Sequence, residues 1–284
     1  MKIKVVCNWT DDLSIMSRFI RNYITDKNFD PELIITHEED YDALLVFNAY
    51  DRNKIRVSKE KVFGFIMEPS WSYNWDKSIG DYCGKVFFHD LSLVPTHQSF
   101  IEHPSMMLYH STNFLNEFES NFPKTKRISM VVRNFGGYGE NQLYHLRMNL
   151  VHSILQTDLP IDIYGKNWHS IDSRIKGEVI NKSDALKDYE FSIAIENSRE
   201  KGYVSEKFFD CILCDTVPIY FGAPNVQEVY PNAFINLDTS NAISQLSQIL
   251  KNQEYSKYFL SIQRAKNKYM NSYNIYNVIK GLLK

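Results

Sequence analysis

Short apolar runs alternate with stretches of helical periodicity along most of the chain. An apolar run bounded by turn residues predicts a buried strand, and apolar positions spaced three and four apart predict an amphipathic helix. Regular alternation of the two favours α/β layers built on parallel sheets. In the first part of the chain the pattern predicts a helix at 12–23 and strands at 3–7, 33–36, 43–47, 62–67, 86–89 and 106–109.

The periodicity lapses over 113–125, a polar stretch that contains a proline, and a domain junction is predicted there. A second series follows, with strands at 128–132, 161–164, 191–195 and 217–221 and helices at 141–156, near 183–187 and at 205–214. The simplest assembly is a domain over 1–120 and a domain over 121–250, both Rossmann-like and facing each other across a cleft. Such folds bind ligands at the carboxyl ends of their strands.

The remaining segment, 251–284, is basic and amphipathic, with seven Lys and Arg against one acidic residue. The first 250 residues carry a net charge of −8, although the whole chain is nearly balanced at −2. That balance argues against a nucleic-acid partner. Two interpretations of the segment stay open: a terminal helix that packs on the body of the protein, or a peripheral contact with an anionic membrane surface.

The predicted location is cytoplasmic, at most peripheral to the inner face of a membrane. No signal peptide precedes the first apolar run, and no apolar run approaches the ~20 residues that span a bilayer. Four cysteines are too few for a disulfide framework. The eight histidines show no metal-ligand spacing, so we expect no metal site and no cofactor.

The richest candidate chemistry lies in 202–211, "GYVSEKFFDC". Ser205 is a good N-cap, and the apolar residues after it have helical spacing. Lys207 then faces the positive end of the helix dipole, at a cost of about 0.3–1 kcal/mol. A phosphate bound at this helix start would turn the lysine into a charge-assisted donor, with Glu206 beside it as an acceptor for ribose hydroxyls. The structural alternative is an outward lysine beside an ordinary helix-start acid.

A second candidate cation is Arg147, which falls on the apolar stripe of the predicted helix 141–156. A guanidinium on that stripe is costly unless it is paired. Together with Lys207, Arg147 could neutralise a diphosphate without a metal. Alternatively it snorkels, or pairs with a structural acid such as Asp162.

The third candidate is Glu68, in "KVFGFIMEPSWSYNW" over 61–75. A carboxylate at a strand end beside Trp71, Tyr73 and Trp75 is what a sugar site offers, since rings stack on sugar faces and apolar surroundings raise a carboxyl pKa towards that of a general base. The alternative is an ordinary strand-end acid whose aromatic neighbours form core.

The run from Glu196-Asn197-Ser198 through Gly202-Tyr203-Val204-Ser205-Glu206-Lys207 to Thr216–Pro224 closely resembles the signature of the α1,3/4-fucosyltransferases, glycosyltransferase family 10. The resemblance is strong over about 35 residues, fainter from Lys126 to roughly Asn236, and limited to Glu68 in the first half. It departs from the family at Ser205, where threonine is usual, and the hydroxyl cap survives.

This resemblance implies a GT-B fold, with an N-terminal acceptor domain and a C-terminal domain that binds GDP-β-L-fucose. It implies metal-independent transfer with inversion, using Glu68 as general base. By position, it implies donor-binding roles for Glu196, Asn197, Tyr203, Glu206, Lys207 and Arg147.

The expected reaction is α1,3-transfer of L-fucose to a hydroxyl of an N-acetylglucosamine-type or glucose-type residue in an oligosaccharide. Such a reaction serves protein glycosylation or surface-polysaccharide synthesis. The alternatives are a GT-B transferase for another nucleotide sugar, or a non-catalytic sugar- or nucleotide-binding protein on the same scaffold.

Overall fold

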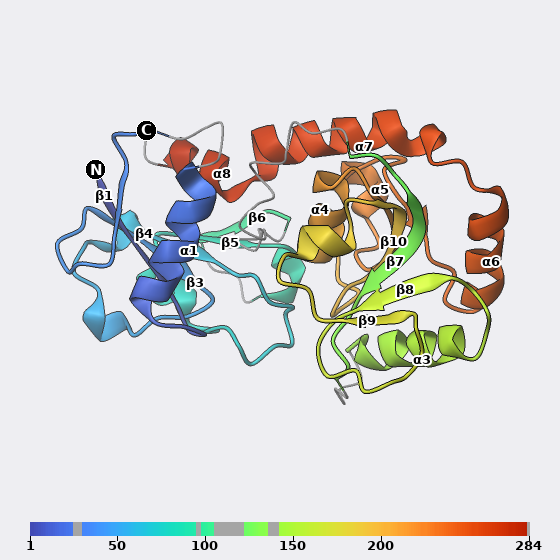
Figure 1. Ribbon diagram of the computed structural model, residues 1–284. Helices are drawn as coiled ribbons and strands as arrows, with labels where there is room; N and C mark the ends of the chain where they lie inside the picture. The colour runs from blue at the N-terminus through green and yellow to red at the C-terminus, as the bar shows by residue number, and fades with distance from the viewer. Residues whose placement is uncertain (25–29, 95–97, 105–121, 136–141, 283–284) are drawn as a thin grey trace. The chain divides into compact units, whose positions relative to one another are not determined.

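The structure, a computed structural model, describes residues 1–24, 30–94, 98–104, 122–135 and 142–282. It contains two compact units, each built on a parallel six-stranded sheet (Figure 1). As far as it is described, unit 1 consists of Met1–Leu115, Glu200–Ser205 and Asn271–Lys284, and unit 2 consists of Asn116–Arg199 and Glu206–Met270. The predicted α/β architecture with two Rossmann-like parts is confirmed.

The sheet of unit 1 has the strand order β2-β1-β3-β4-β5-β6. Its strands are β1 (Lys2–Cys7), β2 (Ile34–Thr36), β3 (Ala43–Phe47), β4 (Val62–Phe65), β5 (Lys85–Phe88) and β6 (Phe100–Glu102). Its helices are α1 (Asp12–Ile24), α2 (Ile79–Tyr82) and α8 (Ile275–Leu282). β3 and β4 are buried at every position, as strands covered on both faces must be.

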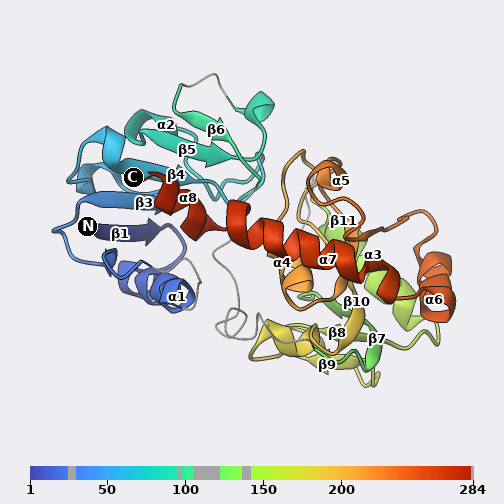
Figure 2. The ribbon, with the colours of Figure 1, turned by 90° about the horizontal axis from the view of Figure 1, so that it is seen from above.

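Helix α8 belongs to unit 1 although it ends the chain. Its Tyr276 ring meets the ring of Phe19 on α1 edge to face, with centroids 5.1 Å apart. Figure 2 shows α8 next to the strands and α1 of the same unit. The segment predicted as one tail, 251–284, is therefore divided between the two units.

The sheet of unit 2 has the strand order β12-β11-β10-β7-β8-β9. Its strands are β7 (Lys126–Val131), β8 (Ile161–Tyr164), β9 (Ile175–Gly177), β10 (Tyr189–Ile195), β11 (Val217–Phe221) and β12 (Ile235–Asn236). Its helices are α3 (Tyr144–Leu155), α4 (Glu206–Leu213), α5 (Val226–Val229), α6 (Ala242–Asn252) and α7 (Ser256–Lys268). In Figure 1, α3 lies below this sheet and α4 and α7 lie above it.

Several predicted elements differ from the observed ones. The helix expected near 183–187 is a single 3-10 turn at Lys182–Ala185. β4 ends at Phe65, two residues before the expected end, because the Met67 N–H donates to the Asn48 side chain instead of a strand neighbour. The predicted strand at 106–109 and most of the predicted junction at 113–125 lie outside the described residues.

Candidate active site

The sheet of unit 2 reverses its winding direction between β7 and β10. From β7 the chain passes through α3 to β8 on one side, and from β10 it passes through α4 to β11 on the other. Neighbouring strands that lead away in opposite directions leave a crevice at their carboxyl ends, where α/β proteins bind ligands.

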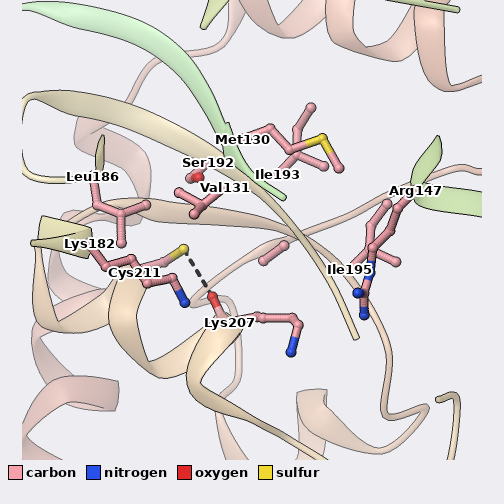
Figure 3. Close-up of a pocket in the computed structure, with 11 residues that line it drawn as sticks. Met130, Val131, Arg147, Lys182, Leu186, Ser192, Ile193, Ile195, Lys207 and Cys211 are labelled. Atoms are coloured by element: carbon pink, nitrogen blue, oxygen red, sulfur yellow. Dashed lines mark hydrogen bonds between the residues drawn. The ribbon is translucent and has the colours of Figure 1, made fainter. Parts of the chain in front are cut away.

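A pocket lies at this switch point, and Arg147 of α3 and Lys207 of α4 both line it. Its other lining residues come mainly from the strands and from α4: Met130, Val131, Lys182, Leu186, Ser192, Ile193, Ala194, Ile195 and Cys211. Figure 3 shows Arg147 and Lys207 entering the pocket from separate elements. The structure thus brings the two predicted cations together, and Asp162 is bonded elsewhere, to the Tyr189 hydroxyl and Lys176.

Asn197 fixes the position of Arg147. The Nη2 group of Arg147 donates to the Asn197 side-chain oxygen at 2.5 Å, and the Leu143 N–H donates to the Asn197 carbonyl at 3.0 Å. Two bonds therefore tie the start of α3 to the end of β10. Arg147 is only 7% exposed, with its guanidinium carbon 4.9 Å from the Tyr144 ring centroid. A buried guanidinium held in one orientation is suited to an anionic ligand.

Lys207 is the second residue of α4, and its charge is offset within unit 2 by two carboxylates. Its Nζ lies 2.9 Å from Glu206 Oε1 and 3.9 Å from Glu196 Oε2. Glu196 is fully buried, and its other oxygen accepts from the Tyr220 hydroxyl at 3.3 Å. The negative charges of Glu206 and Glu196 explain why a lysine is tolerated at the positive end of the helix dipole.

A third cation, Lys182, lines the same pocket and was not predicted. Its Nζ lies 2.5 Å from Asp210, an acid in α4 with a 1% exposed side chain. Burial opposes the charged lysine, but attraction to Asp210 and Glu206 outweighs it and raises the pKa of Lys182. The available signal was Asp210 itself: an acid in the apolar run "FFDCIL" requires a buried partner.

In unit 1, three polar side chains follow the ends of adjacent strands: Asn48 after β3, Glu68 after β4 and His89 after β5. Asn48 adopts φ 65° and accepts from the Met67 N–H at 2.8 Å, which fixes the main chain next to Glu68. Glu68 is partly buried. The structure therefore places the predicted base at the carboxyl edge of its sheet, and His89 beside that edge was missed.

The three predicted acceptor-binding aromatics have different environments. Tyr73 is 99% exposed and Trp71 is partly buried. Trp75 is 5% exposed, belongs to the core of unit 1 and donates its indole N–H to the Pro69 carbonyl. Lys77 covers one of its faces, with Nζ 3.3 Å from the ring centroid. Trp75 thus packs in the core beneath the loop that follows Glu68. This is the alternative interpretation of the sequence, in which the aromatic neighbours of Glu68 form core.

Tyr203 and Ser205 belong to unit 1, whereas Glu206 and Lys207 belong to unit 2. Tyr203 is 2% exposed and packs edge to face on His89, with centroids 5.3 Å apart. Helix α4 begins at Glu206, directly after Ser205, as the capping pattern predicts.

The part of the chain that the structure describes contains no metal-ligand cluster and no membrane-spanning helix. Among those residues, no cluster of three or more His, Cys, Asp or Glu side chains has the geometry to hold a metal ion. None of the described helices combines the length and apolar character needed to cross a bilayer.

Curated proteins with similar sequences include fucosyltransferases. The chain is 36% identical over 69 residues to an alpha-(1,3)-fucosyltransferase of Helicobacter pylori, covering 24% of this chain and 14% of the relative. It is 28% identical over 182 residues to 4-galactosyl-N-acetylglucosaminide 3-alpha-L-fucosyltransferase 9 of Cricetulus griseus, covering 60% and 46%. The alignments thus span less than half the length of these relatives.

Solved structures share the fold. A crystal structure of an alpha1,3-fucosyltransferase with GDP-fucose matches with TM-score 0.51 and 18% identity, over 97% of this chain and 92% of that one. An alpha-glucosyltransferase in complex with UDP matches with TM-score 0.59 and 10% identity over both full chains. The fold is therefore of the GT-B type.

The model of the C-terminal part of glycosyltransferase family 10 (fucosyltransferase) matches residues 122–277. This range includes every site residue described above in unit 2, from Arg147 and Asn197 to Glu206 and Lys207. The chain therefore belongs to glycosyltransferase family 10, the fucosyltransferase family.

Proposed function

We propose that this chain is an inverting, metal-independent fucosyltransferase that moves L-fucose from GDP-β-L-fucose to an oligosaccharide hydroxyl. The expected acceptor is an N-acetylglucosamine-type or glucose-type residue, with an α1,3 linkage. The observation that carries the proposal is the pocket at the switch point of unit 2, where Arg147 and Lys207 meet in a member of this family.

In the proposed reaction, the acceptor oxygen attacks the anomeric carbon of fucose from the face opposite GDP. Its proton passes to the carboxylate of Glu68, and the bond from the anomeric carbon to the β-phosphate oxygen breaks. Negative charge then grows on the departing diphosphate, where Arg147, Lys207 and the first N–H groups of α4 stabilise it.

The remaining residues of the site have supporting roles in this proposal. When Lys207 turns to phosphate it leaves Glu206, its partner at 2.9 Å, which can then accept hydrogen bonds from the ribose. Asn197 keeps Arg147 in place, and buried Glu196 guides Lys207 from the opposite side. For Tyr203, the family resemblance implies a donor-binding role.

The primary test is incubation with a panel of GDP- and UDP-sugars and N-acetylglucosamine-containing oligosaccharides, followed by mass spectrometry and linkage analysis of products. Consumption of GDP-fucose with an added deoxyhexose supports the proposal. Consumption of another donor would assign a different transferase activity. Binding of nucleotide sugar without turnover would indicate the non-catalytic alternative.

Two substitutions separate donor binding from chemistry. Lys207→Ala should weaken GDP binding about 10–150-fold, since a hydrogen bond to a charged group contributes roughly 1.5–3 kcal/mol. Glu68→Gln should lower kcat by about 10²–10⁴ and leave GDP binding nearly intact. Unchanged GDP affinity in Lys207→Ala, measured by calorimetry, would remove the phosphate role.

We further propose that the enzyme acts in the cytoplasm and touches an anionic membrane surface through α7. Lys257, Arg264 and Lys268 of this helix are exposed, next to Leu260 at 69% exposure. In sedimentation with vesicles, binding should require anionic lipid and weaken in Lys257→Glu/Arg264→Glu. Equal binding to neutral vesicles would contradict this electrostatic contact.

A further inference from the structure

The six residues Glu200–Ser205 leave unit 2 after Arg199 and pack on unit 1. They include Tyr203 and directly precede α4, which begins with Glu206 and Lys207. Three contacts anchor this segment to unit 1 through the residues around His89 and Glu102: a buried pair at Glu200, an exposed pair at Lys201 and a close main-chain approach at Gly202.

The Glu200 carboxylate is the centre of these contacts. Its Oε2 accepts from the Ser70 N–H at 2.9 Å and lies 2.7 Å from His89 Nε2. The Glu200 side chain is 13% exposed and that of His89 is 0% exposed. Charge-assisted hydrogen bonds to a mostly buried carboxylate are strong, and without the carboxylate the Ser70 N–H and the buried His89 ring would need other partners.

Ser70 is held on its carbonyl side as well. Lys77 Nζ donates to the Ser70 carbonyl at 2.6 Å and to the Ser72 carbonyl at 3.1 Å. Glu200 therefore binds the peptide group before the Ser70 Cα atom, and Lys77 binds the peptide group after it. Only Pro69 separates Ser70 from Glu68, and a proline fixes its own φ and restricts the residue before it. The orientation of the Ser70 peptide therefore constrains the main chain of Glu68, because the Pro69 between them is rigid.

Gly202 is adapted to this close packing. It has φ +70°, and a Cβ atom at this position would lie 2.4 Å from the His89 carbonyl oxygen. The Tyr203 ring then contacts the His89 ring. His89 therefore meets the segment with both its main chain and its side chain.

We propose that Glu200 and His89 are positioning residues, which hold the Ser70 peptide and thereby the carboxylate of Glu68 for proton transfer. This inference rests on the proposed function for its catalytic part. Glu200 follows the donor-binding strand β10 in the sequence, so one short segment carries both the donor residue Tyr203 and the support for the acceptor-side base.

The first test needs no activity. Amide hydrogen exchange of peptides spanning 66–77 is compared among wild type, Glu200→Ala and the matched control Lys201→Ala. Lys201 pairs with Glu102 at an exposed position, with side chains 49% and 43% exposed. We expect Glu200→Ala to speed exchange at Ser70 about tenfold or more, as loss of a charge-assisted hydrogen bond predicts. Equal exchange in all three proteins would overturn the proposal.

The second test is kinetic. Glu200→Ala should lower kcat roughly 10–100-fold with little change in GDP affinity, whereas Lys201→Ala should stay within about twofold, as exposed pairs contribute little. Glu200→Gln keeps an oxygen for the Ser70 N–H and should recover much of the rate. A general loss of folding would lower GDP affinity too and would not be rescued by glutamine.

A double-mutant cycle with Glu68→Gln decides whether Glu200 acts through the base. Adding Glu200→Ala to Glu68→Gln should cost less than about threefold in kcat, because the group being positioned is already absent. Additive losses would refute positioning of Glu68. If wild type transfers no fucose at all, the proposed function fails, while the exchange experiment still decides the Glu200–Ser70 contact.

Discussion

Replacement of Arg174 by methionine should loosen the helix that carries Arg147. Arg174 lies just before β9, and its side chain, 16% exposed, reaches the end of α3. The last four carbonyls of a helix lack partners within the helix, and here one guanidinium serves that end. Arg174 donates to the carbonyls of Ile154, Leu155, Thr157 and Leu159 and to both oxygens of Asp172.

The loss of stability in Arg174→Met depends on which of the carbonyl groups that lose the guanidinium are then accessible to water. A hydrogen bond from a charged donor contributes roughly 1.5–3 kcal/mol where it is buried. Ile154 is fully buried, but its carbonyl also accepts from the Thr157 hydroxyl at 2.7 Å and from the Thr157 N–H at 3.0 Å. The other carbonyl residues are partly exposed, so these donors and water replace part of what is lost. The Asp172 pair adds little. Adding a helix-dipole contribution of about 0.3–1 kcal/mol, we expect Arg174→Met to destabilise the end of α3 by about 2–4 kcal/mol.

Hydrogen exchange of peptides covering 144–159 measures this directly, since 2–4 kcal/mol corresponds to roughly 30–1,000-fold faster opening. Lys176→Met is the matched control, a nearby lysine whose side chain is 37% exposed. It should change exchange by less than about threefold. Unchanged protection of α3 in Arg174→Met would show that these carbonyls do not depend on the guanidinium, contrary to the argument.

The same pair gives a dependence on pH. Hydrogen bonds from Arg174 lower the pKa of Asp172 to about 2. Because the folded-state pKa lies below the ordinary value of 3.8, the stabilisation is present above that pH and is lost as pH falls towards 2. The main-chain N–H of residue 174 still donates to Asp172 in Arg174→Met, and the Asp172 side chain is partly exposed to solvent. The difference in stability between wild type and this variant should therefore shrink only slightly over this interval in denaturant titrations. A constant difference would contradict the assigned cause.

Three further predictions concern single positions. Gly202→Ala should lower the thermal midpoint, since a left-handed alanine costs roughly 1–2 kcal/mol before the contact with His89 is counted; an unchanged midpoint would show that the segment can move away. Burial raises the pKa of the Cys211 thiol to about 12, so iodoacetamide at pH 9 should leave this cysteine unmodified until the protein unfolds. Because the unfolded thiol ionises near pH 9 and the folded one near pH 12, the contribution of the neutral Cys211 thiol to the free energy of unfolding should be lost as pH rises from 9 to 12. Lys182→Met should destabilise unit 2 by at most about 3–5 kcal/mol, the cost of removing one partner of a buried pair, since Asp210 is buried but the Lys182 side chain is 25% exposed. Lys182→Met/Asp210→Asn should recover part of this loss in urea titrations; no recovery would mean that the unpaired Asp210 carboxylate is not the cause of the loss.

The elements that the sequence predicted well are those whose pattern is set locally. Strands β3, β8 and β11 have the predicted bounds, because each is a mainly apolar run in the interior of a parallel sheet, interrupted in β8 only by Asp162. Three of the four edge strands of the described sheets, β6, β9 and β12, were missed, whereas the edge strand β2 was predicted. β9 and β12 have three and two residues and are only partly buried, so neither forms a recognisable apolar run.

At the candidate site, the sequence indicated charged residues at positions where an unpaired charge would destabilise the fold. Arg147 on an apolar stripe and Lys207 at a helix start both pointed to a partner, and the structure brings both to one pocket. Trp75 could not be assigned in this way, since an aromatic residue after a strand suits a ligand face and a core equally. His89 and Glu200 carry no local signal at all, because their pairing joins positions 111 residues apart.

The division of the chain has a practical consequence for building chimeras with related proteins. A chimera cut once between the two halves of two relatives would take Glu200–Ser205 and α8 from one parent and the surfaces that receive them from the other. The graft would then juxtapose mismatched side chains at Ser70, His89 and Phe19, where the partners are Glu200, Gly202, Tyr203 and Tyr276. Exchanges that move these two short pieces together with the N-terminal half should fold better than single-crossover hybrids.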